Sequence, residues 1–244
     1  MRRITEALIL HQNTVGEKDL LLVLLSPELG RLSALAKGAR RSKRRFVNTL
    51  EPFSYIRAHL RGGKAGLPPF LDQADLLEPF EPLRLDVKRY LFASYFAELV
   101  ECFFRPGTGQ EAFVCLKGAW QSLASMGPSL LLKMALELRL LTLSGFAPEL
   151  RRCVRCEAEV KAPFFFSPLD GGLVCLSCHR EGDLRLSGAA LAALRHLGRT
   201  SFETLSRVKV RREAILEAGG LLEIFLKRVL DREPNALRVL KEMF

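Results

Sequence analysis

The sequence predicts an α+β fold in which a small β-barrel is followed by a helical domain that carries a cysteine-bearing insert. Five short apolar runs, separated by turn residues, fill residues 1–80. Beyond Pro79 the apolar side chains recur at the three- and four-residue spacing of a helix. Two pairs of cysteines interrupt this pattern. We therefore expect four segments, which are residues 1–80, 81–150, 151–182 and 183–244.

The first segment is expected to form strands at residues 7–10, 20–25, 32–36, 53–60 and 70–77. Gly16 marks the first turn, and Gly30 closes the second turn with a backbone that can adopt a positive φ. A long basic loop follows the third run. Short strands with such a loop are typical of closed barrels that bind oligonucleotides, and closure also removes exposed strand edges.

The helical domain is expected to contain helices at residues 83–103, 110–125, 128–144, 189–197, 208–230 and 234–244. Pro106 ends the first helix, because proline cannot continue a helix and disfavours helical geometry in the preceding residue. Gly145 is the predicted C-terminal cap of the third helix, and Ser187 is the predicted N-cap of the fourth. The chain is thus largely helical on both sides of the cysteines.

The positive charge of the chain is concentrated in one place. The formal net charge is +10, and ten basic residues but one acidic residue lie between Arg31 and Lys64. Such a cluster needs a polyanionic partner or a well-solvated loop, and nucleic acid offers the densest phosphates. A solvated loop without a partner is the alternative. We predict that eight of the basic residues bind DNA: Lys37, Arg40, Arg41, Lys43, Arg44, Arg45, Arg57 and Arg61.

Aromatic rings near this cluster suggest a second kind of contact, the stacking of bases. Phe46, Phe53 and Tyr55 follow the cluster closely in the sequence. Phe53 and Tyr55 are expected on one face of the fourth strand, so both are equally candidates for the core. Phe46 and Tyr55 are therefore better candidates for stacking than Phe53.

Four cysteines have the spacing of a metal site. Cys153 and Cys156 form one Cys-x-x-Cys pair, and Cys175 and Cys178 form a second pair after eighteen intervening residues. Two such pairs bring four sulfurs to the corners of a tetrahedron, the geometry of a structural zinc site with no open position for water. We predict one structural Zn²⁺ per chain. Redox-active pairs and ligands that have lost their metal are the alternatives.

Other residues near the four cysteines, and the remaining cysteines, are expected to be structural. Residues 164–174 are predicted to form a hairpin that returns the second pair to the first. His179 lies beside Cys178 but is not needed as a ligand, so it is expected on the surface. Cys102 and Cys115 fall on apolar faces of predicted helices and are expected to be buried thiols.

The sequence contains no motif that indicates catalysis. It has no Walker loop, no Gly-x-Ser-x-Gly elbow and no His-Glu-x-x-His, and its four histidines are scattered. We therefore predict that the protein is not an enzyme. It has no run of about 18 apolar residues that could span a bilayer, and Glu6 and His11 interrupt the apolar core of a signal peptide. A cytoplasmic location without membrane contact is expected.

A series of short motifs runs along the chain. In order they are residues 7–11, Gly16-Glu17-Lys18-Asp19, Leu29-Gly30, Ala36-Lys37-Gly38-Ala39-Arg40, Leu50-Glu51-Pro52-Phe53 and Ala74-Asp75-Leu76-Leu77. Phe166-Ser167-Pro168, Gly171-Gly172 and the two cysteine pairs continue the series. Together they resemble the bacterial RecO family of DNA repair proteins, and the resemblance covers the whole chain.

This resemblance implies an N-terminal OB-fold, a helical domain and a zinc-ribbon-like insert. It implies a recombination mediator that binds ssDNA and dsDNA, anneals complementary strands and helps to load the recombinase onto protein-coated ssDNA. The implied partners are RecR and single-stranded DNA-binding protein, with RecF and RecA engaged indirectly, and the implied location is the nucleoid. The basic element of the family falls on residues 37–45 of this sequence.

Two other functional hypotheses remain open. The first is a zinc-ribbon adaptor whose barrel binds RNA or protein. The second is an enzyme, such as a nuclease or a ligase-like protein, without a recognisable motif. Competition among ssDNA, dsDNA and RNA would test the first, and incubation with labelled DNA and Mg²⁺ would test the second.

Two smaller basic clusters lie outside the first segment. Arg151, Arg152 and Arg155 flank the first cysteine pair and are expected to be solvated. The late basic cluster consists of Arg207, Lys209, Arg211 and Arg212 and is also expected to be solvated. Together with an apolar groove, however, it would suit an acidic peptide with a hydrophobic end, such as the tail of single-stranded DNA-binding protein.

Overall fold

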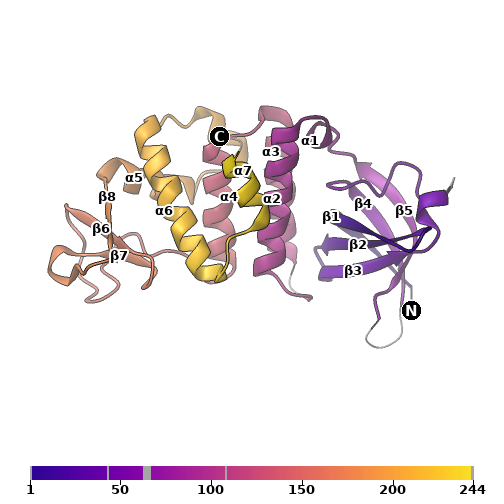
Figure 1. Ribbon diagram of the computed structural model, residues 1–244, viewed down its shortest axis with the longest axis horizontal. Coiled ribbons are helices and arrows are strands. Elements are labelled where there is room, and N and C mark those ends of the chain that lie inside the picture. Colours follow the sequence, from indigo (N-terminus) through magenta and orange to yellow (C-terminus); the bar gives the residue numbers. More distant parts are fainter. Residues whose placement is uncertain (1, 43, 63–66, 108, 243–244) are drawn as a thin grey trace. The chain divides into compact units, whose positions relative to one another are not determined.

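A computed structural model describes residues 2–42, 44–62, 67–107 and 109–242. The chain divides into two compact units, Met1–Gly127 and Pro128–Phe244, and each is described by itself. The predicted α+β class is confirmed, because five strands come first and helices follow (Figure 1). This division after Gly127 coincides with none of the expected boundaries at residues 80, 150 and 182, which stay a prediction.

Five strands form a closed barrel in the first unit (Figure 1). Around the barrel the order is β1–β2–β3–β5–β4, in which β3 and β5 are parallel and the other pairs are antiparallel. This arrangement is an OB-fold, as predicted. The strands are β1 (Arg2–Val15), β2 (Asp19–Ser26), β3 (Gly30–Ala36), β4 (Tyr55–Arg61) and β5 (Phe70–Glu78).

The first strand is much longer than its apolar run. Residues 2–8 of β1 pair with β4, and residues 8–15 pair with β2. The first half of β1 therefore pairs with one neighbouring strand and the second half pairs with the other, which lets the sheet close on itself. Apolar periodicity could not predict that β1 includes the polar residues at its two ends, because backbone pairing rather than burial holds them in the strand.

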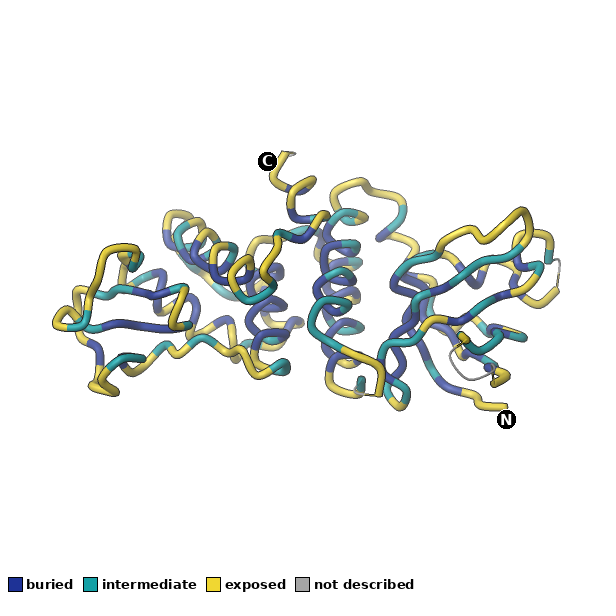
Figure 2. The backbone as a smooth tube through the Cα atoms, turned by 60° about the horizontal axis from the view of Figure 1, so that its bottom comes forward, coloured by how far each residue is buried: buried dark blue, intermediate teal, exposed yellow. Residues whose placement is uncertain are grey.

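Apolar side chains from all five strands fill the barrel. The contributing residues include Ala7, Ile9, Leu22, Leu24, Ala34, Ile56 and Leu71. Ala39, Phe46 and Leu50 of the segment between β3 and β4 belong to the same core. Figure 2 shows the buried strands and the exposed connections between them. The basic segment is thus attached to the barrel by its own apolar residues.

Besides the 3₁₀ helix η1 (Ala39–Arg41), the described part of the first unit contains three α-helices: α1 (Pro82–Leu85), α2 (Val87–Phe103) and α3 (Gln110–Met126). The indole of Trp120 on α3 is fully buried, and its centroid lies 5.3 Å from that of Phe53. Gly109, just before α3, permits a close approach, since a Cβ there would overlap the carbonyl oxygen of Ser26. These helices therefore pack tightly against the barrel.

The second unit contains four α-helices in its described residues: α4 (Leu130–Leu143), α5 (Gly188–Leu197), α6 (Arg212–Leu230) and α7 (Asn235–Glu242). Both predicted caps are confirmed. Gly145 has a φ of +82° after α4, and the hydroxyl of Ser187 accepts a hydrogen bond from the N–H of Ala190 at 3.1 Å. These caps satisfy backbone groups that the helices leave unpaired.

The predicted start of α6 is wrong by four residues. The helix begins at Arg212 instead of residue 208, after the 3₁₀ helix η3 (Phe202–Arg207) and four residues outside regular helix. Val208 and Val210 explain the difference, because β-branched side chains favour extended backbone over helix. Lys209 and Arg211 therefore lie in an irregular segment, between Arg207 of η3 and Arg212 of α6.

The cysteine-bearing insert forms a small sheet with the order β7–β6–β8. The predicted hairpin is confirmed by β6 (Phe164–Ser167) and β7 (Gly172–Val174), whereas β8 (Leu184–Leu186) is an additional strand that the sequence did not reveal. Three residues are too few to show an alternating pattern. The ring of Phe166 packs on Phe225 of α6 with centroids 5.6 Å apart, which attaches the sheet to the helices.

Within the described residues, no helix combines the length and the apolar character needed to cross a membrane.

Candidate nucleic-acid interface and metal centre

The basic loop, residues 37–45, begins at a turn that the neighbouring hairpin holds. Gly38 has a φ of +66°, and its N–H donates a hydrogen bond to Oδ1 of Asp19 at 2.8 Å. The N–H of Arg40 donates to the carbonyl of Lys18 at 3.2 Å. Two of the sequence motifs therefore meet in space, and Asp19 sets where the basic loop leaves the barrel.

The described cationic side chains of the basic loop are exposed, whereas two apolar residues beside them are buried. Ala39 and Phe46 are buried in the barrel core. Lys43 lies outside the described residues. The structure therefore places five of the predicted DNA-binding residues on one exposed loop: Lys37, Arg40, Arg41, Arg44 and Arg45.

Arg45 also braces the loop from within. Its Nη2 donates a hydrogen bond to the carbonyl oxygen of Lys37 at 2.7 Å, and its guanidinium carbon lies 5.0 Å from the centroid of the Phe46 ring. The hydroxyl of Ser42 accepts a hydrogen bond from the N–H of Arg45 at 3.1 Å. The two ends of the basic loop are thus held together by the side chain of Arg45.

Arg61 of β4 lies beside the basic loop. The ring centroid of Phe70 is 5.0 Å from Nζ of Lys37 and 5.1 Å from the guanidinium carbon of Arg61. Nε of Arg61 is also 3.0 Å from Oδ2 of Asp72, an exposed ion pair that offsets part of its charge. The structure therefore places Arg61 at the predicted interface, but its positive charge is partly neutralised by Asp72.

Arg57 is separated from this interface. It lies four residues before Arg61 on β4, in register with Glu6 of β1 and Asp75 of β5. The carboxylate of Asp75 accepts a hydrogen bond from Nε2 of His59 at 2.9 Å, and this contact lowers the pKa of Asp75. Arg57 thus lies among acidic neighbours, whose negative charge opposes the approach of a phosphate, so it is a weaker candidate for a DNA contact than the loop residues.

The hypothesis of base stacking is wrong for all three rings. Phe46, Phe53 and Tyr55 are only 6%, 1% and 8% exposed. The hydroxyl of Tyr55 donates a hydrogen bond to the carboxylate of Glu6, and burial together with this carboxylate raises the pKa of Tyr55 to about 12. Nζ of Lys117 lies 4.0 Å from the centroid of the Tyr55 ring. These rings build the protein core and present no free face to a base.

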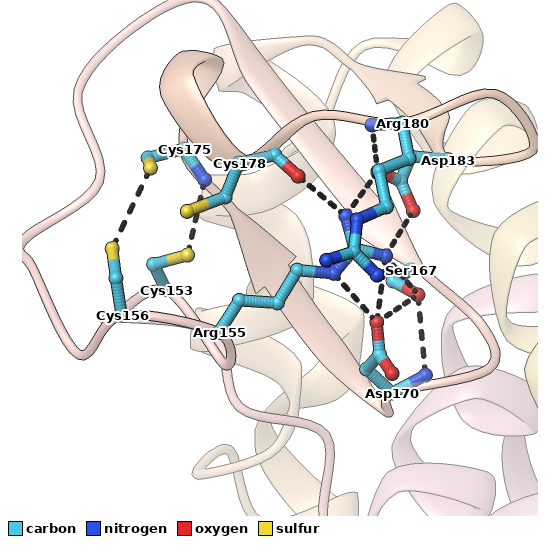
Figure 3. Close-up of polar contacts among 9 residues, drawn as sticks. All are labelled: Cys153, Arg155, Cys156, Ser167, Asp170, Cys175, Cys178, Arg180 and Asp183. Carbon is cyan, nitrogen blue, oxygen red and sulfur yellow. Dashed lines mark hydrogen bonds and ion pairs between the residues drawn. The ribbon is translucent and has the colours of Figure 1, made fainter.

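The four predicted metal ligands come together in the second unit. The sulfurs of Cys153, Cys156, Cys175 and Cys178 all lie within 4.8 Å of one another, and those of Cys156 and Cys175 are 3.7 Å apart (Figure 3). A tetrahedral zinc ion with Zn–S bonds of about 2.3 Å separates its sulfurs by about 3.8 Å. The donor set and its spacing therefore fit a metal ion.

The electrostatics of this quartet also favour a bound cation. Burial opposes ionisation of the Cys153 thiol, but N–H groups of Cys175, Arg155 and Cys156 lower its pKa to about 6. The sulfurs of Cys156 and Cys175 raise the pKa of Cys178 to about 12. Four thiolates in such proximity repel one another, and a divalent cation would relieve that repulsion.

The side chain of Arg155, inside the first cysteine pair, holds the insert together instead of being solvated as expected. Nε donates to Oδ2 of Asp170 at 2.8 Å, and Nη1 donates to the carbonyl of Cys178 at 2.6 Å (Figure 3). Nη1 and Nη2 also bind both carboxylate oxygens of Asp183 at 2.7 and 2.9 Å. Sequence spacing gave no signal for this contact, because its partners are 15 to 28 residues away.

We expect Arg155→Lys to weaken metal retention and to lower the free energy of unfolding of the second unit. Lysine keeps the charge but cannot reproduce the two-pronged contact with Asp183, and a hydrogen bond to a charged group contributes about 1.5–3 kcal/mol. The measurement is metal release under chelator together with urea unfolding. Arg152→Lys, at an exposed position of the same segment, is the matched control. Equal metal release from both variants would contradict the role of Arg155.

The remaining predictions around the cysteines are confirmed in part. His179 is exposed, and its ring lies 4.0 Å from that of Phe165. Cys115 is buried, whereas Cys102 is half-buried. Neither of these two cysteines belongs to the quartet.

The late basic cluster borders a groove of about 1130 Å³ in the second unit. Its apolar lining comes from α5 and from the irregular segment before α6, with Ala189, Ala193, Val208 and Val210 as examples. Arg212 is not one of the residues that line it. The cationic lining residues are Arg199, Arg207, Lys209 and Arg211, and no acidic residue of the described chain lines the groove.

Two family models match the chain over most of its length. The model described as Recombination protein O N terminal matches residues 1–80. The model described as Recombination protein O C terminal matches residues 84–238. The chain belongs to the RecO family. RecO is a family of DNA repair proteins, so this membership assigns the chain a role in DNA repair.

Curated RecO proteins of several bacteria are similar to this chain along nearly its whole length. DNA repair protein RecO of Dehalococcoides mccartyi is 30% identical over 236 residues, which are 96% of this chain and 92% of the relative. That of Desulforudis audaxviator is 33% identical over 243 residues, with 98% and 96% covered. That of a Roseiflexus species is 32% identical over 243 residues, with 98% and 85% covered.

Proposed function

We propose that this protein binds ssDNA and dsDNA through the basic loop, anneals complementary strands without catalysis, and helps to load the recombinase onto protein-coated ssDNA. The observation that carries the proposal is the architecture of the loop. Five exposed cationic side chains project from a segment that Ala39, Phe46 and Leu50 anchor in the barrel core. The field of these cations is therefore held in place instead of fluctuating with a free chain.

Annealing needs no enzyme chemistry in this proposal. Two complementary strands repel through their phosphates, and a protein that neutralises several phosphates on each strand lowers that barrier. Each contact with single-stranded DNA changes the slope of log K against log salt by about −0.7, so six contacts from residues 37–45 predict a slope near −4. A salt series of ssDNA binding tests the proposal, and a slope near zero would overturn it.

The proposed cofactor is one structural Zn²⁺ per chain, held by Cys153, Cys156, Cys175 and Cys178. Support comes from the all-sulfur donor set and the mutual distances of the sulfurs. Four thiolates complete a tetrahedral coordination sphere, so the ion would stabilise the insert and offer no position for a reacting water. The residues of the chain provide the ligands and, through Arg155, the bracing of the site.

The groove of the second unit supports a proposal about partners. An apolar lining with a cationic rim is complementary to an acidic peptide that ends in hydrophobic residues. We assign this groove to the tail of single-stranded DNA-binding protein, which would place the protein on coated ssDNA in the cytoplasm, at the nucleoid. RecR and, indirectly, RecF and RecA remain proposed partners without assigned residues.

We expect Arg207→Glu/Lys209→Glu to weaken binding of a free tail peptide at least about tenfold, because two attractive contacts become repulsive. The measurement is fluorescence anisotropy with a labelled acidic peptide at low micromolar protein. Lys227→Glu/Arg228→Glu at the end of α6 makes the same change of net charge outside the groove and is the matched control. Absence of peptide binding to the parent, or equal loss in both variants, would contradict this assignment.

A further inference from the structure

A hollow of about 470 Å³ lies next to the basic loop in the first unit. Its walls come from the end of the β1–β2 hairpin and from residues 39–51 of the segment between β3 and β4. Ligand pockets in proteins span about 300–1,000 Å³, so the hollow has the size of a small-molecule site. The phosphate contacts proposed for the basic loop and the metal site proposed for the cysteines do not assign a role to this hollow.

The lining combines apolar surface with neutral polar groups. The accessible apolar part comes from Val47, which is 52% exposed, and from the half-buried Leu20, whereas the Phe46 and Leu50 that also line the hollow are buried in the barrel core. Gln12 and Thr14 reach the hollow from one face of β1. A flat ring fits such surroundings, since the apolar surface covers its face while amide and hydroxyl groups bind its edge.

Asn48 adds a second amide to the lining. Its backbone φ of +53° places it in the left-handed region, which asparagine tolerates better than most residues. Asparagine and glutamine amides carry both a donor and an acceptor, which is the pattern that base edges require. Gln12 comes from β1 and Asn48 from the segment between β3 and β4, so a ring in the hollow would have amide partners from two separate segments.

The charges around the hollow favour a base over a phosphate. Arg40 lines it on the side of the basic loop, and Glu51 lines it too. A carboxylate repels a phosphate but accepts a hydrogen bond from the exocyclic amino group of a base. Because Arg40 also belongs to the basic loop, phosphates of the same strand would bind next to the hollow.

We propose that this hollow binds one unstacked nucleobase of a strand whose phosphates lie on the basic loop. The inference rests on the proposed function, because it requires that the loop binds DNA. It also adds a property that charge alone lacks. A base in a duplex is stacked and paired, so the hollow would favour ssDNA, and it would release its base when the complementary strand pairs with it.

The test compares an oligonucleotide with an abasic strand of the same length and the same number of phosphates. We expect the parent protein to bind the intact strand about tenfold more tightly at equal salt, equivalent to about 1.4 kcal/mol. Gln12→Leu/Thr14→Leu fills the hollow and removes its polar edge, so the affinity ratio should fall to about one while the salt slope is unchanged.

The matched control is Asn13→Leu/Val15→Leu, which changes exposed residues on the opposite face of β1. It should keep the tenfold ratio. Asn48→Gly is a second variant that suits the positive φ at this position and removes one amide, so it should lower the ratio even if the double variant does not fold.

Two results would overturn the inference. One is a parent ratio of one with a steep salt slope, because the loop would then bind DNA without contacting a base. The other is an unchanged ratio in both hollow variants. A parent with no salt slope would instead remove the proposed function, and the inference with it, so the two failures are distinguishable.

Discussion

Arg40→Gln/Arg41→Gln/Arg44→Gln should weaken ssDNA binding about a hundredfold at 0.1 M salt and make strand annealing correspondingly slow. Removing three phosphate contacts should flatten the slope of log K against log salt by about 2. Because this relation is linear, a slope difference of 2 corresponds to about two factors of ten between 1 M and 0.1 M salt. Fluorescence anisotropy across a salt series measures both quantities.

The choice of these three arginines follows from the structure. Their side chains are exposed, and Nη1 of Arg40 donates an exposed hydrogen bond to the carbonyl of Glu17 at 3.2 Å. Lys37 and Arg45 are left in place, because Arg45 bonds to the Lys37 carbonyl and braces the loop. The variant therefore removes charge while the backbone of the loop keeps its anchors.

The matched control is Lys227→Gln/Arg228→Gln/Arg238→Gln, which removes three exposed charges from α6 and α7. It lowers the net charge equally, so it should keep the parent slope if the effect is local. Equal weakening by both triple variants would show that net charge, not the basic loop, drives DNA binding. A loop variant that binds and anneals like the parent would eliminate the loop as the site.

Cys175→Ser/Cys178→Ser should abolish metal binding and unfold the insert. Structural zinc sites contribute an apparent 10–16 kcal/mol at about neutral pH, which is comparable to the whole stability of a typical domain, about 5–15 kcal/mol. The three short strands of the insert cannot replace such a contribution. Elemental analysis should find about one zinc per chain in the parent and none in the variant.

Hydrogen exchange locates the effect of this variant along the chain. Amides of β6, β7 and β8 should lose protection, and α6 should be weakened where Phe225 loses the ring of Phe166. Salt-dependent ssDNA binding should persist, because the basic loop belongs to the other compact unit. Cys115→Ala, outside the quartet, should leave the metal content unchanged. A parent without metal, or a protected insert in the variant, would contradict this prediction.

Local patterns in the sequence were sufficient to predict the presence of the five barrel strands, the hairpin of the insert, most helices, the caps at Gly145 and Ser187, and the quartet of cysteines. Each of these depends on residues close together in the chain, such as the alternation within β4 or the two-residue gap of a Cys-x-x-Cys pair. The concentration of charge between Arg31 and Lys64 was equally visible. These features follow from composition and spacing, which need no knowledge of the fold.

Closure of the barrel and packing of distant segments determined the rest. Phe46 and Phe53 became core, Arg57 was placed among carboxylates, and Arg155 found partners across the insert. The hollow between Gln12 and Asn48 exists only because the segment after β3 returns to the β1–β2 hairpin. Such contacts join residues far apart in sequence, and their free energy depends on which surfaces folding buries together rather than on any local pattern.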